Sequence, residues 1–214
     1  MRYERKFRTE EASLSAVQLI TRMHPACFRQ LYPPRWVNNL YFDTPEFAAF
    51  NDNASGAPNR VKYRLRWYGR PFERLKDPVL EIKWKEGEVG SKRGHALDKG
   101  VYRLLQLVEL ADVARSLIHK GKELQPVLFN SYYRSYFGAA NGQFRLTIDS
   151  SLQFGAYRLS GAHLLPFQLP GIILEVKYPL EEEPNSDLIF QNLPFRQTKS
   201  SKYVMGLGLV YGLT

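Results

Sequence analysis

The stretch Val79-Leu-Glu-Ile-Lys-Trp-Lys-Glu86 alternates between apolar and charged side chains. Its apolar residues occupy every second position from Leu80 to Trp84, and charged residues fill the positions between them. A period of two is typical of a β-strand with one buried face. For this segment alone, the simplest interpretation is a strand whose charged face is solvated.

The same alternation recurs along the chain, in segments separated by short turns. Asn141-Gly142, for example, is a residue pair typical of a β-hairpin turn. Strands joined by such turns pair antiparallel. About eight strands are predicted, at residues 2–8, 38–42, 60–68, 79–86, 126–137, 143–149, 152–159 and 172–178.

The polar faces of these strands carry mostly one sign of charge. Only four acidic residues lie on them: Glu4, Glu81, Asp149 and Glu175. Eleven basic residues accompany these acids: Arg2, Lys6, Arg8, Lys62, Arg64, Arg66, Lys83, Lys85, Arg134, Arg145 and Lys177. A solvated face normally mixes the two signs, which limits repulsion. A face this basic indicates a bound anion.

Closing eight strands into a ring removes the sheet edges and turns one face inward. The period of two does not choose which face this is. Helices are predicted after Thr9, which is the expected N-cap, at residues 45–50, at 101–120, after 187 and at 200–211. Residues 87–100 are expected to form a mobile basic loop. Because helices are available to cover the apolar face, we expect a charged interior. The predicted fold is α+β, an eight-stranded antiparallel β-barrel (tunnel) with a charged lumen and peripheral helices, in a single domain over residues 1–214.

The composition excludes several classes of protein. A hydrophobic fraction of 44% in 214 residues excludes a disordered chain. The single Cys27 excludes an intramolecular disulfide and fits a reducing compartment, and the four scattered histidines show no metal-ligand spacing. The N-terminus is charged from residue 2 and no apolar run approaches the length of a membrane span, so we expect a cytoplasmic protein that does not itself span a membrane.

The net charge of +9 points to polyanionic partners. The excess lies on strand faces and not in a basic tail, which favours a shaped anion site over nucleic-acid binding. Gly206-Leu-Gly208 lacks the strand–turn–helix context of a dinucleotide fingerprint, and the sequence contains no P-loop. The aromatic residues near Arg134 are able to stack on a nucleotide base, but core packing is the simpler interpretation for all four: Tyr132, Tyr133, Tyr136 and Phe137.

Nine short motifs together resemble a known family. They are Glu4-Arg-Lys6, Asn39-Leu-Tyr-Phe-Asp-Thr-Pro45, Lys62-Tyr-Arg-Leu-Arg-Trp-Tyr-Gly69, Leu80-Glu-Ile-Lys83, Ser91-Lys-Arg93, Tyr133-Arg134, Arg145-Leu-Thr-Ile-Asp149, Leu174-Glu-Val-Lys177 and Ser201-Lys-Tyr203. In this order they resemble the triphosphate tunnel metalloenzyme superfamily. Within it, the chain looks most like the VTC (vacuolar transporter chaperone) catalytic domain family of polyphosphate polymerases.

The resemblance implies a role for each matching residue. By the family pattern, seven residues bind and act on phosphates in the lumen: Lys6, Arg64, Arg66, Lys83, Arg134, Arg145 and Lys202. Three more are implied phosphate ligands: Lys92 and Arg93, near the tunnel mouth, and Lys177. Glu175 matches the family's metal-binding glutamate, with Glu4 and Glu81 as further metal candidates and Asp149 as a weaker one. The implied cofactor is Mg²⁺ or Mn²⁺, which take oxygen ligands from carboxylates and phosphates.

The first strand departs from the pattern of the superfamily's hydrolases. Those proteins tend to begin with Glu-x-Glu-x-Lys, and here the first position is Arg2. One fewer carboxylate weakens the case for a two-metal hydrolase and fits a tunnel that holds phosphates.

Three activities therefore remain open. The first is a metal-dependent phosphotransferase that adds the terminal phosphate of ATP to polyphosphate. The second is transfer to water, which makes a tripolyphosphatase or nucleoside triphosphatase. The third is a sensor that binds inorganic polyphosphate or tripolyphosphate without turnover. A separate membrane partner is compatible with all three.

Overall fold

This computed structural model describes residues 2–71, 73–87, 89–103, 106–118, 123–157 and 167–213. The strands are β1 (Arg2–Thr9), β2 (Arg29–Asp43), β3 (Asn59–Tyr68), β4 (Arg74–Glu86), β5 (Val89–Ala96), β6 (Val101–Arg103), β7 (Gln125–Gly138), β8 (Arg145–Ala156), β9 (Phe167–Leu169), β10 (Ile172–Pro179) and β11 (Arg196–Thr198). The helices are α1 (Leu14–Met23), α2 (Ala48–Ala54), α3 (Leu107–Ile118), the 3-10 helix η2 (Leu180–Asn185), α4 (Ser186–Phe190) and α5 (Lys202–Tyr211). Within the described ranges, no helix is both long and apolar enough to cross a membrane.

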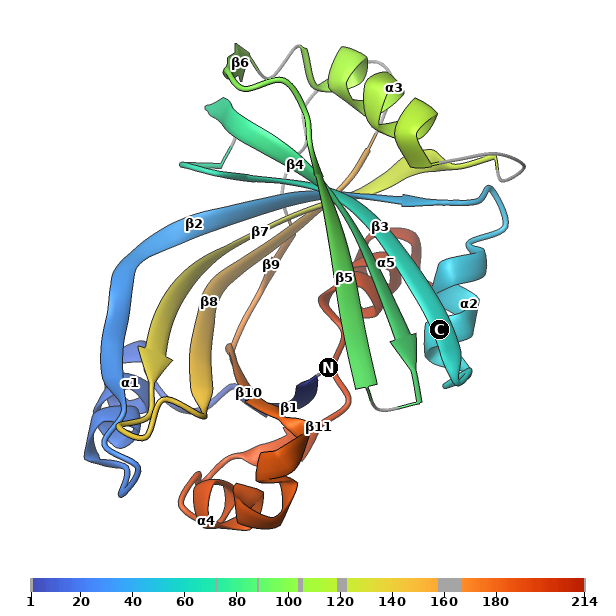
Figure 1. Cartoon of the computed structure of the whole chain (residues 1–214). Helices are drawn as coiled ribbons and strands as arrows, with labels where there is room; N and C mark the ends of the chain where they lie inside the picture. Colours follow the sequence, from blue (N-terminus) through green and yellow to red (C-terminus); the bar gives the residue numbers. More distant parts are fainter. Residues whose placement is uncertain are drawn as a thin grey trace.

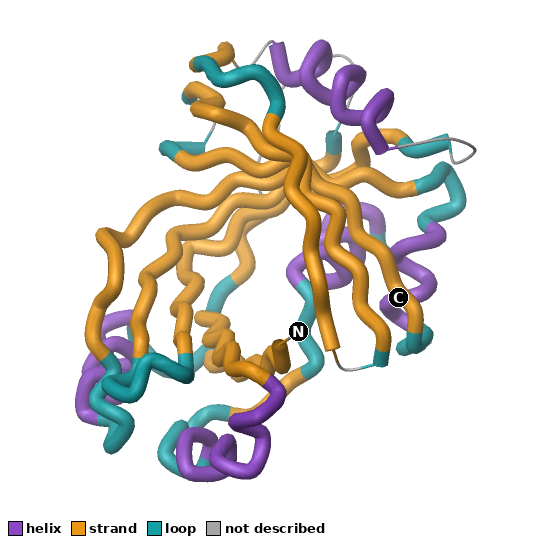
Figure 2. Tube along the Cα trace, in the orientation of Figure 1, coloured by secondary structure: helices purple, strands orange, loops and turns teal. Residues whose placement is uncertain are grey.

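Eight strands hydrogen-bond in a closed ring, in the order β1–β5–β4–β3–β2–β7–β8–β10 and back to β1. Each pairing in the ring is antiparallel, as the short connections predict. The short strands β6, β9 and β11 add to β4, β8 and β1 outside this ring. Figures 1 and 2 show the long strands curving around a common interior. The predicted α+β fold, with eight antiparallel strands around a tunnel, is confirmed.

The apolar strand faces point away from this interior, and helices cover them. Leu146 of β8 packs in one cluster with Val17 of α1 and Ile189 of α4. Leu80 of β4 packs in a second cluster with Leu110 of α3. Figure 1 shows α3 across one end of the sheet and α1 and α4 near the other. Since the apolar faces are covered from outside, the charged faces line the inside.

Helix α5 occupies one end of the ring. Its Tyr203 packs with Tyr41 of β2 and Phe154 of β8 in a third apolar cluster. The Tyr203 hydroxyl donates a hydrogen bond to the Asp43 carboxylate. Asp43 also accepts the backbone N–H group of Ala49, near the start of α2. One buried carboxylate therefore joins α5, α2 and the end of β2.

Strand β8 replaces two strands that the sequence predicts at residues 143–149 and 152–159. The side-chain alternation changes phase at Ser151, whose φ of 52° accompanies a register shift against β7. Ile148 before this bulge packs in the outer cluster, whereas Leu152 after it packs in the cluster around α5. A change of phase looks like a strand end in the sequence, and here it turns apolar side chains inward. Residues 158–159 lie outside the described residues.

The predicted mobile loop at residues 87–100 was wrong for most of its length. Strand β5 pairs with β4 from Val79↔Ala96 to Glu86↔Val89. The segment has few apolar side chains, so its sequence lacks the apolar–polar alternation that predicts a strand. Its conformation comes from backbone hydrogen bonds to β4, which only the tertiary fold supplies.

Three of the predicted helix starts are displaced. Thr9 ends β1, and Ser13 caps α1 by accepting the backbone N–H group of Ala16. The helix predicted at residues 45–50 begins only at Ala48. The predicted helix at 101–120 begins as β6 and continues as α3; residues 104–105 and 119–120 of that prediction lie outside the described residues.

Gly206 provides a test of how α5 packs. A Cβ at this position would lie 2.5 Å from Cδ1 of Phe154 and 2.6 Å from Cδ2 of Leu128. We expect Gly206→Ala to lower the free energy of unfolding by about 1–3 kcal/mol, because overpacking displaces the helix. The control Leu209→Ala, on the exposed side of α5, should change it by less than about 0.5 kcal/mol. Urea denaturation measures both, and an unchanged midpoint for Gly206→Ala would contradict this packing.

Candidate functional site

Strand register brings the charged residues together inside the ring. Across the β3–β4 pairing, Arg64 lies opposite Glu81 and Lys62 lies opposite Lys83. Across β4–β5, Lys83 lies opposite Lys92. Directly opposed residues share a face of the sheet. The alternation seen in the sequence is therefore one continuous charged lining.

Glu81 of β4 holds three cationic side chains. Its carboxylate lies 2.6 Å from Nη2 of Arg64, 3.4 Å from Nη1 of Arg66 and 3.0 Å from Nζ of Lys92. Burial alone would raise the pKa of Glu81, but the three cations outweigh burial and lower it below its usual value. Glu81 is therefore ionised and holds both arginines in place.

A second cluster joins β7, β8, β10 and α5. Arg134 donates two hydrogen bonds to Asp149, at 2.5 and 2.6 Å, and one to Glu175 at 3.2 Å. Lys202 of α5 lies 2.6 Å from Asp149 and 3.1 Å from Glu175. Burial opposes the charge on Lys202, yet the two carboxylates raise its pKa above the usual value. Lys202, at the N-terminus of α5, therefore adds a positive charge to the lumen.

The third cluster lies between β1, β4 and β10. Glu4 lies 3.3 Å from Lys6, 3.2 Å from Lys83 and 3.5 Å from Lys177. Lys177 also lies 3.2 Å from Glu175, so one ammonium group joins this cluster to the second. Burial lowers the pKa of Lys83 to about 8, although Glu4 opposes the shift.

Glu4 and Glu175 are the pair best placed to hold a divalent cation. Both lie within 3.5 Å of Nζ of Lys177, a position that is already cationic. Among the residues described, no three acidic, histidine or cysteine side chains gather as metal ligands. Two carboxylates with substrate oxygens and water suit Mg²⁺, which seldom has an all-protein cage. Glu81 does not fit this role as well, because two arginines and Lys92 surround it.

Lys62 is a lumen residue that the sequence analysis left outside its predicted ligands. Its Nζ donates a hydrogen bond to Oγ of Ser201, the N-cap of α5, at 2.9 Å. Burial lowers its pKa well below the usual value, and Lys6 and Lys83 lower it further. Within the described chain, Lys62 has no salt bridge. The signal was available in the sequence, because Lys62 shares a face with Arg64 two residues later.

Neutral side chains position the two arginines of β3. Arg64 donates to the Tyr41 hydroxyl, and Arg66 donates to Oδ1 of Asn39 at 2.9 Å. Asn39 in turn donates to Asn130. Both Asn39 and Tyr41 belong to the motif 39–45 quoted above, and neither was predicted as part of the site.

Two predicted phosphate ligands lie away from the centre of the lumen. Arg145 begins β8 opposite Lys177, and its side chain is exposed at the end of the lining. Arg93 lies opposite Ile82, on the other face of β5 from Lys92, and is exposed. The structure therefore does not bring Arg93 together with the lumen cations.

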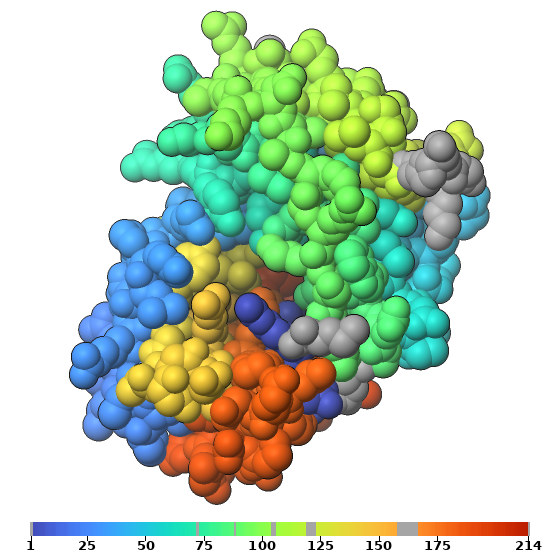
Figure 3. Space-filling view, in the orientation of Figure 1, coloured from blue at the N-terminus to red at the C-terminus, as the bar shows by residue number. Residues whose placement is uncertain are grey.

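The lumen has a large formal excess of positive charge. Nine basic residues of the described chain line it: Lys6, Lys62, Arg64, Arg66, Lys83, Lys92, Arg134, Lys177 and Lys202. Their carboxylate partners number four: Glu4, Glu81, Asp149 and Glu175. Figure 3 shows the surface hollowed between the green atoms of β4 and β5 and the yellow atoms of β7 and β8. The excess of five suits an anion with several charges.

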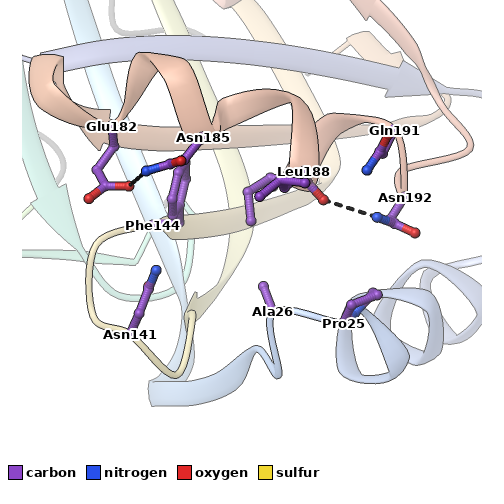
Figure 4. Close-up of a pocket in the computed structure, with 10 residues that line it drawn as sticks. Pro25, Ala26, Asn141, Phe144, Glu182, Asn185, Leu188, Gln191 and Asn192 are labelled. Atoms are coloured by element: carbon purple, nitrogen blue, oxygen red, sulfur yellow. Dashed lines mark hydrogen bonds between the residues drawn. The ribbon is translucent and has the colours of Figure 1, made fainter.

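A cavity of about 460 Å³ lies outside the lumen, between the end of α1 and the η2–α4 segment (Figure 4). Amide side chains, including Asn141 and Asn192, line it with the apolar Phe144 and Leu188. Glu182 is its charged residue. A lining without a cation is unsuited to phosphate, so we place the candidate site in the lumen.

Comparison with solved structures shows the same fold in three proteins. A candidate adenylate cyclase from Vibrio parahaemolyticus matches with a TM-score of 0.56 and 14% identity, over 95% of this chain and 97% of that one. A candidate adenylyl cyclase from Hippeastrum, described as having a dominant triphosphatase activity, matches with a TM-score of 0.55 and 18% identity, over 98% and 97%. A candidate adenylate cyclase from Bacillus halodurans matches with a TM-score of 0.53 and 15% identity, over 94% and 95%.

Comparison of the sequence itself gives the family. No curated protein matches the chain. A family model described as the VTC domain matches residues 1–211, which is nearly the whole chain. The nine motifs predicted this family, and the closed ring with its charged lining agrees with the prediction. The chain belongs to the VTC domain family.

Proposed function

We propose that the protein is a metal-dependent phosphotransferase of polyphosphate-polymerase type. It binds ATP and polyphosphate in the lumen and transfers the terminal phosphate of ATP to the end of the polyphosphate chain. The observation that carries this proposal is a lumen lined by nine basic side chains and only four carboxylates. Bound phosphates would neutralise the remaining charge.

The chemistry needs little covalent help from the protein. Phosphoryl transfer depends on in-line positioning and on stabilising charge on the transferred group. Arg64, Arg66 and Arg134 offer guanidinium groups already oriented by carboxylates. Preorganised donors stabilise a transition state because they need not reorient during the reaction.

Glu4 and Glu175 are the residues that we propose to hold Mg²⁺ or Mn²⁺. Such an ion would supply positive charge that helps to neutralise the phosphates of the substrate. Burial would raise the pKa of both glutamates, but the lysines around Glu4 and the cations around Glu175 lower the two values well below normal. Both carboxylates are thus ionised at neutral pH and ready to coordinate a hard cation.

Hydrolysis is the second candidate function. The Hippeastrum structure, which shares the fold, is described as a triphosphatase. Water in place of the polyphosphate end would make this chain a tripolyphosphatase or nucleoside triphosphatase with the same residues. The superfamily's hydrolases tend to have a glutamate where this chain has Arg2, and that glutamate would add a metal ligand. Its replacement by Arg2 favours the polymerase.

The proposed partners are ATP and inorganic polyphosphate or tripolyphosphate. Nucleic acid is not among them, because the cations line a ring interior that a duplex does not enter. The single cysteine fits a reducing compartment, so we place the activity in the cytoplasm, with or without a membrane partner.

An assay with ATP and Mg²⁺ or Mn²⁺ tests the proposal, with long-chain polyphosphate and free phosphate measured together. Arg64→Ala should lower both turnover and tripolyphosphate binding, with turnover falling roughly 100-fold through loss of a transition-state donor. Glu175→Gln should abolish turnover yet keep tripolyphosphate binding, because it removes a metal ligand and a negative charge. Arg22→Ala, on the exposed surface of α1, is the matched control.

The products decide between the candidates. Polymer that is lost in both lumen variants supports the polymerase. Free phosphate without polymer would show that the protein is a hydrolase and not a polymerase. Tight tripolyphosphate binding without either product would leave only a sensor and end the enzyme proposal.

The pKa of Lys83 gives a pH dependence. This pKa is about 8 in the free protein. A bound phosphate favours the charged form of Lys83 and therefore raises its pKa. Above pH 8 the complex then holds more protons than the free protein. Tripolyphosphate affinity should therefore fall as the pH rises from 8 to 10. Lys83→Arg should flatten this fall, since arginine stays charged. Calorimetric titration at several pH values measures both, and identical slopes would contradict the assignment.

Lys62 should stabilise the bound protein and destabilise the free one. Its charge repels Lys6 and Lys83 in the free lumen. Lys62→Met should raise the melting temperature of the free protein and reduce the further rise caused by tripolyphosphate. Lys99→Met, at an exposed position, should change neither. A lower melting temperature together with an undiminished ligand effect would show that Lys62 is only structural.

A further inference from the structure

The inner face of the ring continues past its arginines into aromatic side chains. Tyr68 follows Arg66 by two residues on β3, and Tyr136 follows Arg134 by two residues on β7. Residues at this spacing share a face and lie about 7 Å apart along a strand. Arg35 of β2, the strand between β3 and β7, lies directly opposite Arg134. We call Arg35, Tyr68 and Tyr136 the aromatic rim.

The guanidinium group of Arg35 ties the rim together. Its Cζ lies 3.8 Å from the ring centroid of Tyr68 and 5.3 Å from that of Tyr136. Its Nε donates a hydrogen bond to the Tyr136 hydroxyl at 3.2 Å. Tyr32 adds an edge-to-face contact with Tyr136, with centroids 5.8 Å apart. These contacts build a layer of flat groups beyond Arg66 and Arg134.

The rim is open to solvent. Arg35 is exposed, Tyr68 is 36% exposed and Tyr136 is partly buried, whereas Tyr132, four residues from Tyr136 on β7, is 2% exposed. A cavity of about 460 Å³ borders Tyr68, and its charged lining residues are Arg70, Glu73, Arg74 and Lys76. Exposed rings beside cations are a surface on which a flat aromatic ligand stacks favourably.

We propose that the aromatic rim is the subsite for the nucleobase of a nucleoside triphosphate whose phosphates lie in the lumen. This inference rests on the proposed function and adds to it the residues that distinguish a nucleoside triphosphate from inorganic tripolyphosphate. The base stacks on the layer formed by Arg35, Tyr68 and Tyr136. The phosphates reach Arg66 and Arg134, two residues deeper on the same strands.

The same position suits a base better than a further length of polyphosphate. A phosphate chain would call for cations free to contact it, but the Arg35 guanidinium lies against one ring and is hydrogen-bonded to the other tyrosine. Tyrosine rings offer a polyphosphate chain only single hydroxyl groups. Stacking tolerates any base, so the rim selects nucleotides as a class and does not read which base is present.

Binding of ATP and of inorganic tripolyphosphate to the full-length protein, measured by calorimetric titration, separates the base from the phosphates. Tyr68→Leu should weaken ATP about tenfold, in the range of one lost base–aromatic contact, and leave tripolyphosphate unchanged. Tyr68→Phe should restore ATP binding, because it keeps the ring. Arg35→Lys keeps the charge but loses the flat group, and should weaken ATP selectively. Arg22→Ala, on the exposed surface of α1, removes a charge outside the rim and its cavity and is the control.

Each other outcome overturns the inference. Equal losses of ATP and tripolyphosphate in Tyr68→Leu and Arg35→Lys would show that the rim acts only through charge or folding. A selective loss of long-chain polyphosphate, with ATP unchanged, would make the rim a chain-binding surface. If the unmodified protein binds ATP and tripolyphosphate but the variants change neither, the nucleobase subsite fails and the proposed function stands. If the unmodified protein binds neither anion, the proposed function fails as well.

Discussion

Repulsion between cations inside a closed ring is the constraint on which this structure depends. Nine basic side chains share one interior. Four carboxylates hold eight of them, and the ninth, Lys62, donates a hydrogen bond to Ser201. Each carboxylate contacts at least two cations, and Lys177 links Glu4 to Glu175. The pairs do not neutralise the lumen. They orient its cations and leave a net charge that an anion is needed to balance.

This charged interior requires the apolar surface to lie outside. In an ordinary barrel, apolar side chains fill the centre. Here the outward faces of β4, β8 and β10 are covered by α1, α3 and α4, so the hydrophobic cores lie between the ring and its helices. Burial of these faces contributes the stability, and the lumen can then use side chains that a core would exclude.

Helix α5 is the exception, because it packs within one end of the ring. It can do so where the inward face becomes apolar, beyond the bulge at Ser151 of β8. The same helix brings Lys202 to Asp149 and Glu175, and its N-cap Ser201 accepts from Lys62. Packing at that end therefore positions part of the phosphate-binding lining.

Much of this protein could be predicted from its sequence. Alternation with a period of two located most of the strands, and the one-sided charge of their polar faces indicated an anion site, because both properties are local along the chain. Strand β5 could not be found in this way, since it depends on backbone pairing with β4. The start of α2 could not be found either, since it depends on the carboxylate of Asp43. Only the tertiary structure decided that the charged face turns inward. Only it separated Arg93 from Lys92, placed Lys62 against the N-cap of α5 and placed Arg35 between two tyrosines, because these relations depend on which elements become neighbours when the ring closes.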